Sequence, residues 1–438
     1  MPLTPHQTTL IKATVPILKA HGNEITTRFY ESLISEVPSL KNIFNLTNQK
    51  NGHQPMALAS SLYAYASYID DLGVLSPAVE KICQKHAALF VRPEQYDVVG
   101  TYLLRAMGEV LGEGLTDEVK EAWAVAYQQL ASIMINREAE LTTQSPDNWS
   151  DWRDFRIVRK VPESSNITSF YLEPVDGGHL PSFKPGQYIS VRVDVPELGC
   201  MQTRQYSLSD APGKPYYRIS VKREDGVLRS SASKTENMPG VISNILHLSK
   251  SQGDIIQLSN PAGDFFYDGA TDKGPVVCIS AGVGVTPMMS ILESPVASPD
   301  SSSASTNGAT GNAKKITFIH ATHDSETQPF TSFLSSISAR NPDSIRTIIF
   351  NPRPSSSPLS SSQPAAATAA GGLQIHTTRL ALSVLNAARD LFLDDKEAVY
   401  FVCGPASFMS DVRAWLEGKG VESTRVRSET FGTGALLG

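Results

Sequence analysis

The spacing of hydrophobic residues changes twice along this chain, and it begins as the spacing of helices. Up to about residue 142, apolar side chains recur every three to four positions, as in "EITTRFYESLISEV" and "EQYDVVGTYLLRAMGEVLG". No segment of this region alternates as a strand would, so residues 1–148 are predicted to form an all-α domain. The predicted helices begin or end at five residues that favour helix boundaries: Gly22, Pro38, Pro77, Pro93 and Gly114.

The polar linker "TTQSPDNWSDW" then leads into a region with the period of strands. Between 152 and 268, short runs rich in β-branched and aromatic residues alternate with turn residues. Their spacing predicts an antiparallel β-barrel. The predicted strands are "FRIVRKVP", "ITSFYLEPV", "QYISVRVDV", "RQYSLSD", "YYRISVKRE" and "DIIQLSNPAG".

From 269 to 438, strand patterns alternate with helix patterns. The segments "PVVCISAG", "KITFIHAT" and "AVYFVCG" each precede a helical segment, which is typical of an open, mostly parallel α/β sheet. Two stretches, 299–313 and 353–372, are rich in small and polar residues. We expect both to be mobile surface insertions, because such compositions cannot pack a core.

Composition narrows the class of protein. A chain of 438 residues is too long for one ordinary domain. The formal net charge of −6 argues against nucleic acid or an anionic membrane as a partner. No stretch approaches the roughly 20 apolar residues that cross a bilayer. The N-terminus lacks signal-peptide features and the four cysteines form no CxxC pair, so we expect a cytoplasmic protein, taken as a monomer.

Two glycine-containing turns follow predicted strands of the third region. "SAGVGVTPM" places Gly282 and Gly284 between a strand and a helix, where a backbone can approach a phosphate closely. A single turn of this kind has a purely structural role about as often as it binds a phosphate. The second, "FVCGPASFM", follows another strand, and two turns at one sheet edge are what a dinucleotide crevice requires. Cys403 is then either a small buried residue or a neighbour of the nicotinamide.

The barrel region carries a flavin signal. "RQYS" places Arg204, Tyr206 and Ser207 on one short strand, and "PGQY" adds Tyr188 upstream. A flavin nucleotide requires a cation for its diphosphate and an aromatic or hydroxyl group near its ring system. Each residue alone is compatible with an ordinary barrel strand. The ordered combination of "RQYS", "AGVGVTP" and "CGP" is much more specific.

With these motifs, residues 152–438 resemble the ferredoxin–NADP reductase superfamily. The resemblance implies an FAD-binding barrel followed by an NAD(P)-binding domain. It assigns FAD to Tyr188, Arg204, Gln205, Tyr206 and Ser207. It assigns the pyridine nucleotide to Gly282, Val283, Gly284, Val285, Thr286, Pro287, Cys403, Gly404 and Pro405.

His86 lies in "KICQKHAALFVRPEQY", on a predicted helix that ends before a proline turn. Taken alone, such a histidine is more often an ordinary core or surface residue. A helical domain fused to a flavin reductase is, however, a candidate electron acceptor, and haem is the expected cofactor. Tyr30, Phe44 and Gln54 suit an open site for a gas on the opposite side. His53, the competing ligand, is interpreted as a solvated polar residue.

The whole chain then closely resembles the flavohaemoglobins, through "RFY", "IFN", "NQKNGHQ", "VEKICQKHAALFVRPEQYDVVG", "INREAE", "RQYSL" and "AGVGVTP". The resemblance makes His86 the proximal ligand of haem b. Glu138 and Tyr96 are expected to bond to its imidazole, although from the residues alone a solvated glutamate and a surface tyrosine are simpler interpretations. Glu140 is the rival carboxylate and is expected to face solvent.

The resemblance also implies roles for residues around the haem and the flavin. Tyr30 is expected to donate to O₂ with support from Gln54, while Phe44 and Leu58 line the pocket. Lys85 is expected to meet a haem propionate or the flavin domain. Glu429 and Phe431 are expected near the flavin, although the C-terminus lacks the family's usual proline.

The implied activity is nitric oxide dioxygenation, in which electrons pass from NAD(P)H through FAD to haem and nitric oxide with O₂ becomes nitrate. Two alternatives remain: an oxygen-binding or sensing globin, and a haem or flavin reductase with peroxidase-like activity. Val285 stands where the family often has a polar residue, so the nucleotide contact can differ. We expect NADH rather than NADPH, because "HATHDSETQ" (320–328) contains no arginine and Asp324 repels a 2′-phosphate.

Overall fold

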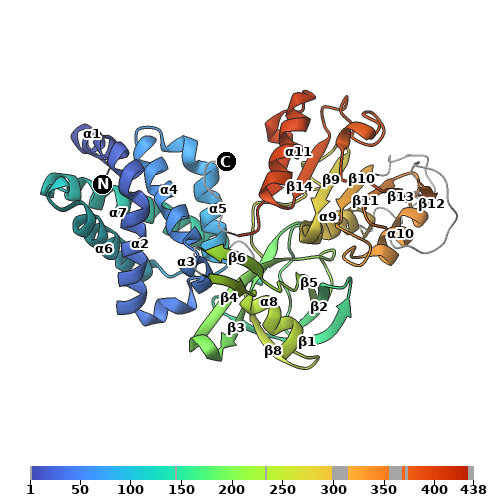
Figure 1. The fold of residues 1–438 in the computed structure, drawn as a ribbon, viewed down its shortest axis with the longest axis horizontal. Coiled ribbons are helices and arrows are strands. Elements are labelled where there is room, and N and C mark those ends of the chain that lie inside the picture. The colour runs from blue at the N-terminus through green and yellow to red at the C-terminus, as the bar shows by residue number, and fades with distance from the viewer. Residues whose placement is uncertain are drawn as a thin grey trace.

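Three bodies of structure follow one another along the chain (Figure 1). The computed structural model describes residues 2–143, 146–231, 234–297, 314–354, 367–369 and 373–432. The insertion predicted at 299–313, most of the insertion at 353–372 and the last six residues of the chain lie outside the described residues. In Figure 1 the helices α1 to α7 gather at one end, and the barrel strands and the parallel sheet form the other.

The first body is all-α, as predicted. Its core contains Phe29, Leu33 and Trp123, which are almost fully buried. Its α-helices are α1 (Pro5–Ala13), α2 (Val15–Glu36), α3 (Leu46–Lys50), α4 (His53–Ser67), α5 (Ser76–Ala87), α6 (Pro93–Leu111) and α7 (Asp117–Thr143). Three short 3₁₀ helices join them: Pro38–Asn42, Leu72–Leu75 and Gly112–Gly114.

The helix break predicted at Gly22 is wrong, because α2 continues through it. A Cβ at this position would lie 3.4 Å from the Cβ of Ala59 on α4. The glycine therefore allows two helices to approach closely rather than ending one. The break lies earlier, at Thr14, and Pro16 stands in the first turn of α2, where its missing N–H costs no helical bond. The boundaries predicted at Pro38, Pro77, Pro93 and Gly114 are confirmed.

The second body is an antiparallel sheet with the strand order β4-β3-β8-β1-β2-β5. An isolated bridge between Leu208 and Ile219 connects the two outer strands and closes the barrel. All six predicted strands are present: β1 (Arg153–Pro162), β2 (Ile167–Pro174), β3 (Tyr188–Val195), β4 (Cys200–Ser207), β5 (Tyr217–Lys222) and β8 (Ile255–Leu258). The sequence did not predict the hairpin of β6 (Val227–Ser231) and β7 (Lys234–Met238) or the short helix α8 (Val241–Asn244).

The third body is a sheet with the order β12-β13-β11-β10-β9-β14-β15, parallel except at β12. Helices α9 and α10 cover one face and α11 covers the other, because alternate residues of the strands face opposite cores. The strands are β9 (Val276–Ala281), β10 (Ile316–Ala321), β11 (Ile345–Phe350), β12 (Ala367–Ala369), β13 (Leu373–His376), β14 (Val399–Cys403) and β15 (Val426–Glu429). The helices are α9 (Val285–Ala297), α10 (Thr331–Arg340) and α11 (Ala406–Gly418).

The predicted α/β class of the third body is confirmed, but three of its strands were missed. They are β12, β13 and β15, of three or four residues each. Strand β12 lies inside the stretch 353–372 and pairs with β13. That part of the stretch is an edge strand, contrary to the expectation of a mobile insertion throughout.

Candidate functional site

His86 lies in the last turn of α5, where its ring is held from one side. Its Nδ1 lies 2.9 Å from Glu138 Oε1 on α7 and 2.9 Å from Tyr96 Oη on α6. The phenol of Tyr96 donates to the same carboxylate oxygen at 2.5 Å. A carboxylate only accepts, so Nδ1 carries the proton and Nε2 is the nitrogen with a free lone pair. That arrangement fits the proximal ligand of a haem iron.

The acid–phenol pair behind His86 is buried. Burial and the hydrogen bond to Glu138 raise the pKa of Tyr96, so the phenol stays protonated and donates. The rival carboxylate, Glu140, is largely exposed and pairs with Arg137 at 2.9 Å, as its expected solvent-facing position requires. The three elements α5, α6 and α7 thus bring together residues 86, 96 and 138, as the resemblance implied.

Tyr30, the predicted distal donor, lies on α2. Its ring meets Phe44 edge to face, with 5.4 Å between centroids. Burial raises the pKa of Tyr30 by more than a hydrogen bond from the Gln54 side chain lowers it, so the phenol stays protonated and can donate. Gln54 Oε1 is buried and has no partner in the described structure, which fits a pocket that holds a further polar group. Leu58 packs at the edge of the same core, while His53 is exposed.

Strand β4 carries the predicted flavin residues. Its neighbour β3 places Tyr188 opposite Ser207 in the antiparallel register. Arg204 donates to the carbonyl of Thr203 at 2.7 Å and to Thr47 Oγ1 at 3.3 Å. Within the described residues this guanidinium has no carboxylate partner, and burial lowers its pKa. A largely buried cation without an anion fits a bound diphosphate.

The remaining predicted flavin residues lie beside Arg204. Tyr206 is on the same strand, and burial raises the pKa of its phenol. Gln205 hydrogen-bonds to Tyr188, whose pKa is also raised by burial. Tyr188 packs against Ala262 and against Ala88, two residues after the candidate iron ligand. The flavin face of the barrel therefore touches the end of α5.

The two glycine turns meet at one edge of the parallel sheet. Strands β9 and β14 are neighbours, with Ser280 opposite Cys403. A Cβ on Gly284 would lie 2.3 Å from the carbonyl oxygen of Cys403, so only glycine permits this contact. Gly282 has a φ of 54°, in the left-handed region. The turn 282–284 leads directly into α9 and the turn 404–405 into α11, as a nucleotide crevice requires.

The Thr286 hydroxyl donates within its own turn, to the carbonyl of Val283 at 3.0 Å. The ammonium of Lys85, in the last turn of α5, donates to the carbonyl of Gly432 at 3.1 Å and so bonds to the C-terminal segment. Val285 is fully buried, and Pro287 follows in the same first turn of α9.

Glu429 lies at the same sheet edge, opposite Cys403 in the register of β15 with β14. Burial is the main cause that raises the pKa of Glu429 to about 7, while Lys81 and Lys85 oppose it. The pKa of Cys403 is raised by burial and by Glu429, so its thiol stays neutral. Phe431, two residues further on, is exposed.

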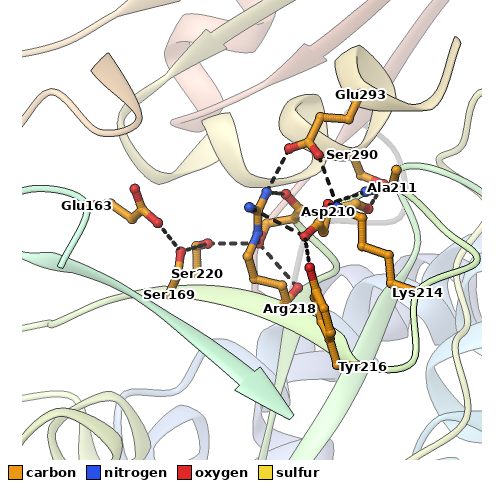
Figure 2. A network of polar contacts seen from close by, with 11 residues as sticks. Glu163, Ser169, Asp210, Ala211, Lys214, Tyr216, Arg218, Ser220, Ser290 and Glu293 are labelled. Atoms are coloured by element: carbon orange, nitrogen blue, oxygen red, sulfur yellow. Dashed lines mark hydrogen bonds and ion pairs between the residues drawn. The ribbon is translucent and has the colours of Figure 1, made fainter. Parts of the chain in front are cut away.

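A buried ion cluster joins the barrel to α9, and sequence reasoning did not select it (Figure 2). Arg218 on β5 donates to Glu293 on α9 at 2.9 Å and lies 3.5 Å from Asp210. Lys214 pairs closely with Asp210 and lies 3.6 Å from Glu293. Ser290 donates to the carbonyl of Asp210 at 2.7 Å. The helix that begins at the first glycine turn is thus bonded to the segment that follows the flavin strand.

An arginine lies close to the stretch used above to favour NADH. Arg353 follows β11, and its carbonyl accepts from the N–H of Ser325 at 3.4 Å. Asn351, from the same loop, donates to Ser325 Oγ at 2.8 Å. The stretch 320–328 therefore lies beside a loop that contains an arginine, which the sequence of the stretch itself does not reveal.

Among the helices of the described segments, none combines the length and the apolar character needed to cross a membrane.

Comparisons with known proteins agree with this geometry. The globin family model matches residues 27–134, and that of the ferric reductase NAD binding domain matches 274–416. The chain is 41% identical to a flavohemoprotein of Bordetella parapertussis, over 99% of this chain and 100% of the relative. It is 40% identical to one of Rhizobium meliloti, over 98% of each chain.

A solved structure gives the same result for the fold. The flavohemoglobin of Malassezia yamatoensis, determined with bound FAD and heme, superposes with a TM-score of 0.76 and 25% identity. The match covers 98% of this chain and 100% of that one. By its sequence over the full length and by its fold, this chain belongs to the flavohaemoglobin (flavohemoprotein) family.

Proposed function

We propose that this protein is a nitric oxide dioxygenase, which uses electrons from NADH or NADPH to convert nitric oxide and O₂ to nitrate and so removes nitric oxide. Family membership supports the coarser statement, an NAD(P)H-dependent oxidoreductase with FAD and haem b as cofactors. The dioxygenase activity itself is supported by the residues around the proposed haem. His86, Glu138 and Tyr96 form a hydrogen-bonded unit for the proximal side, and Tyr30 and Gln54 form a polar pair for the distal side.

The proximal unit prepares His86 to bind iron. When bound here, haem supplies an iron centre that takes O₂, and FAD converts hydride from the nicotinamide into single electrons. Glu138 accepts a hydrogen bond from the Nδ1–H group, and Tyr96 holds that carboxylate in place, so the imidazole acquires partial anionic character. Such a ligand donates more electron density to the metal than a neutral imidazole does.

The distal residues hold a polar gas in a mostly apolar pocket. Tyr30 keeps its proton and donates a hydrogen bond, and Gln54 supplies an amide beside it. Phe44 and Leu58 exclude water from the same space. A donor in a dry pocket stabilises negative charge that develops on the ligand more strongly than the same donor would in water.

The reductase part supplies the electrons, and we propose the bounds 1–148, 152–268 and 269–438 for the three domains. Arg204 neutralises the FAD diphosphate, while Gln205, Tyr206, Ser207 and Tyr188 line the flavin. The glycine turns 282–284 and 404–405 receive the nicotinamide nucleotide, with Val283, Val285, Thr286 and Pro287 in the first and Cys403 beside the second. Glu429 at the end of β15 and Phe431 beyond it border the flavin. Lys85, next to His86 in sequence, bonds to the same C-terminal segment.

The test is the consumption of nitric oxide by purified holoprotein with NADH and O₂. We expect one nitrate per nitric oxide, at a rate far above that of free haem and abolished without NADH. A rate no higher than that of free haem would exclude dioxygenation. Turnover of peroxide instead would favour the peroxidase-like reductase, since the Glu138–His86 bond also suits that chemistry. Stable O₂ binding without any turnover would favour an oxygen-binding globin.

Coenzyme choice, location and oligomeric state belong to the same proposal. We propose a cytoplasmic monomer that prefers NADH. The ratio of kcat/KM for NADH and NADPH tests the preference, and the variant Arg353→Ala tests the arginine whose backbone bonds to Ser325. If Arg353 binds a 2′-phosphate, the variant loses activity with NADPH and keeps its activity with NADH.

A further inference from the structure

The barrel edge that carries the flavin residues is bonded directly to the distal side of the helical domain. We propose that Gln202 is a positioning residue for the distal pocket: it holds segment 41–47 on strand β4 and thereby sets Phe44 against Tyr30. The inference rests on the proposed haem site, because Tyr30 acts on the haem ligand only if that site is correct.

Gln202 is 1% exposed, and both ends of its amide reach across to the helical domain. Its Nε2 donates to the carbonyl of Lys41 at 2.8 Å and lies 3.4 Å from the carbonyl of Phe44. Its Oε1 accepts from the N–H of Leu46 at 3.3 Å. The nearest acceptors of the two Nε2 hydrogens are the carbonyls of Lys41 and, within β4, of Met201 at 2.9 Å. The side chain therefore bonds to backbone groups on both sides of Phe44.

The residues around Gln202 extend this contact. The N–H of Met201 donates to Asn42 Oδ1 at 2.9 Å, so an outward-facing group of the edge strand β4 is satisfied by the helical domain. Arg204, two residues after Gln202, donates to Thr47 Oγ1 at 3.3 Å. Positions 202 and 204 lie on the same face of the strand. The candidate cation for the FAD diphosphate thus shares its face with Gln202.

Segment 43–45 is held by backbone bonds of Ile43 and Phe44 to Leu40 within the helical domain and by the contacts with Gln202 from outside it. It lies between the 3₁₀ helix that ends at Asn42 and α3, which begins at Leu46, and has no regular structure of its own. Phe44 in this segment packs edge to face on Tyr30. A shift of the segment therefore moves the ring that confines the Tyr30 phenol.

The first variant is Gln202→Leu, which removes both ends of the amide at similar volume. We expect faster hydrogen–deuterium exchange of the amides in 42–47, in the apoprotein as well as the holoprotein. We expect O₂ to leave the reduced holoprotein about three to ten times faster, the effect of one lost positioning hydrogen bond. Anaerobic reduction of FAD by NADH should not change.

The matched control is Gln257→Leu on β8, a glutamine of the same barrel. Its amide bonds to Arg192 and Asp154, both within the barrel. It should leave exchange in 42–47 and O₂ release unchanged. If Gln202→Leu folds poorly, Gln202→Met removes the same hydrogen bonds with a flexible side chain of similar volume, and the same effects are expected.

A double-variant cycle with Tyr30→Phe separates positioning from general loosening. If Gln202 acts through Phe44 and Tyr30, the change at 202 has no further effect on O₂ release once the phenol is gone. Additive effects, unchanged exchange in 42–47, or an equal slowing of FAD reduction would each overturn the inference. None of these measurements involves nitric oxide, so a failure of the proposed dioxygenation is recognised separately.

Discussion

At the scale of single residues, the charge on Glu138 is what distinguishes this proximal site from that of a neutral histidine. Replacing Glu138 by Gln keeps an oxygen that accepts from His86 Nδ1 but removes the negative charge. We expect nitric oxide turnover to fall roughly 10- to 100-fold, the usual effect of losing a partner behind a metal ligand. The iron–histidine stretching frequency of the reduced protein should fall as well.

Glu140→Gln provides the control for this prediction. Glu140 lies on the same helix but is largely exposed and pairs with Arg137, which also bonds to Glu80. This variant should leave both the stretching frequency and the turnover unchanged. Equal effects of the two substitutions would show that charge anywhere on α7, and not the bond to His86, tunes the iron.

At the scale of elements, the contact between the two glycine turns determines whether the nucleotide crevice can form. In Gly284→Ala the new methyl group would collide with the carbonyl of Cys403, so the start of α9 must move away from β14. We expect reduction of FAD by NADH to slow by roughly one to two orders of magnitude, because hydride transfer is sensitive to misplacement of about 1 Å. Stopped-flow absorbance at the flavin band measures this.

Two comparisons make that result specific. Gly418→Ala, at the end of α11, meets no atom within 4 Å and should leave the rate unchanged. Photochemical reduction of the flavin, which bypasses NADH, should still deliver electrons to haem in Gly284→Ala. If electron transfer from the photoreduced flavin to haem is lost as well, the substitution damages the whole molecule rather than the crevice.

At the scale of the whole molecule, the ion cluster in Figure 2 makes the joint between barrel and sheet sensitive to pH. Burial and the neighbouring Asp210 raise the pKa of Glu293 from 4.5 to about 7, while Arg218 and Lys214 oppose that rise. A carboxyl group whose pKa is raised by folding stabilises the folded state below 4.5. This contribution is lost as the pH rises through about 7.

Glu293→Gln should therefore flatten the fall in the unfolding midpoint between pH 5 and 8, as measured by thermal denaturation at several pH values in this range. The slope should shrink without vanishing, because Glu429 also has a pKa raised to about 7. Glu140→Gln is again the control and should keep the full slope. An unchanged slope in Glu293→Gln would place the titration elsewhere.

Much of the fold followed from local pattern. The helical spacing, the six barrel strands and the principal strands and helices of the sheet were predicted correctly, because these depend on residues two to four positions apart. The short strands β12, β13 and β15 were missed, since three or four residues carry too little periodicity. Gly22 was misinterpreted because a glycine that ends a helix and one that admits a neighbouring helix look alike in sequence.

The candidate site also has residues that local motifs predict and contacts that only the tertiary structure decides. His86, Arg204 and the glycine turns belong to contiguous motifs, so the sequence by itself determined the types of cofactor and predicted these residues as their ligands. Only the tertiary structure decided which groups meet across the chain. Gln202 bonds to a segment about 160 residues away, and Arg218 bonds to Glu293 at a separation of 75. The reason is physical: a polar side chain far from its partner resembles any solvated residue until folding removes its water.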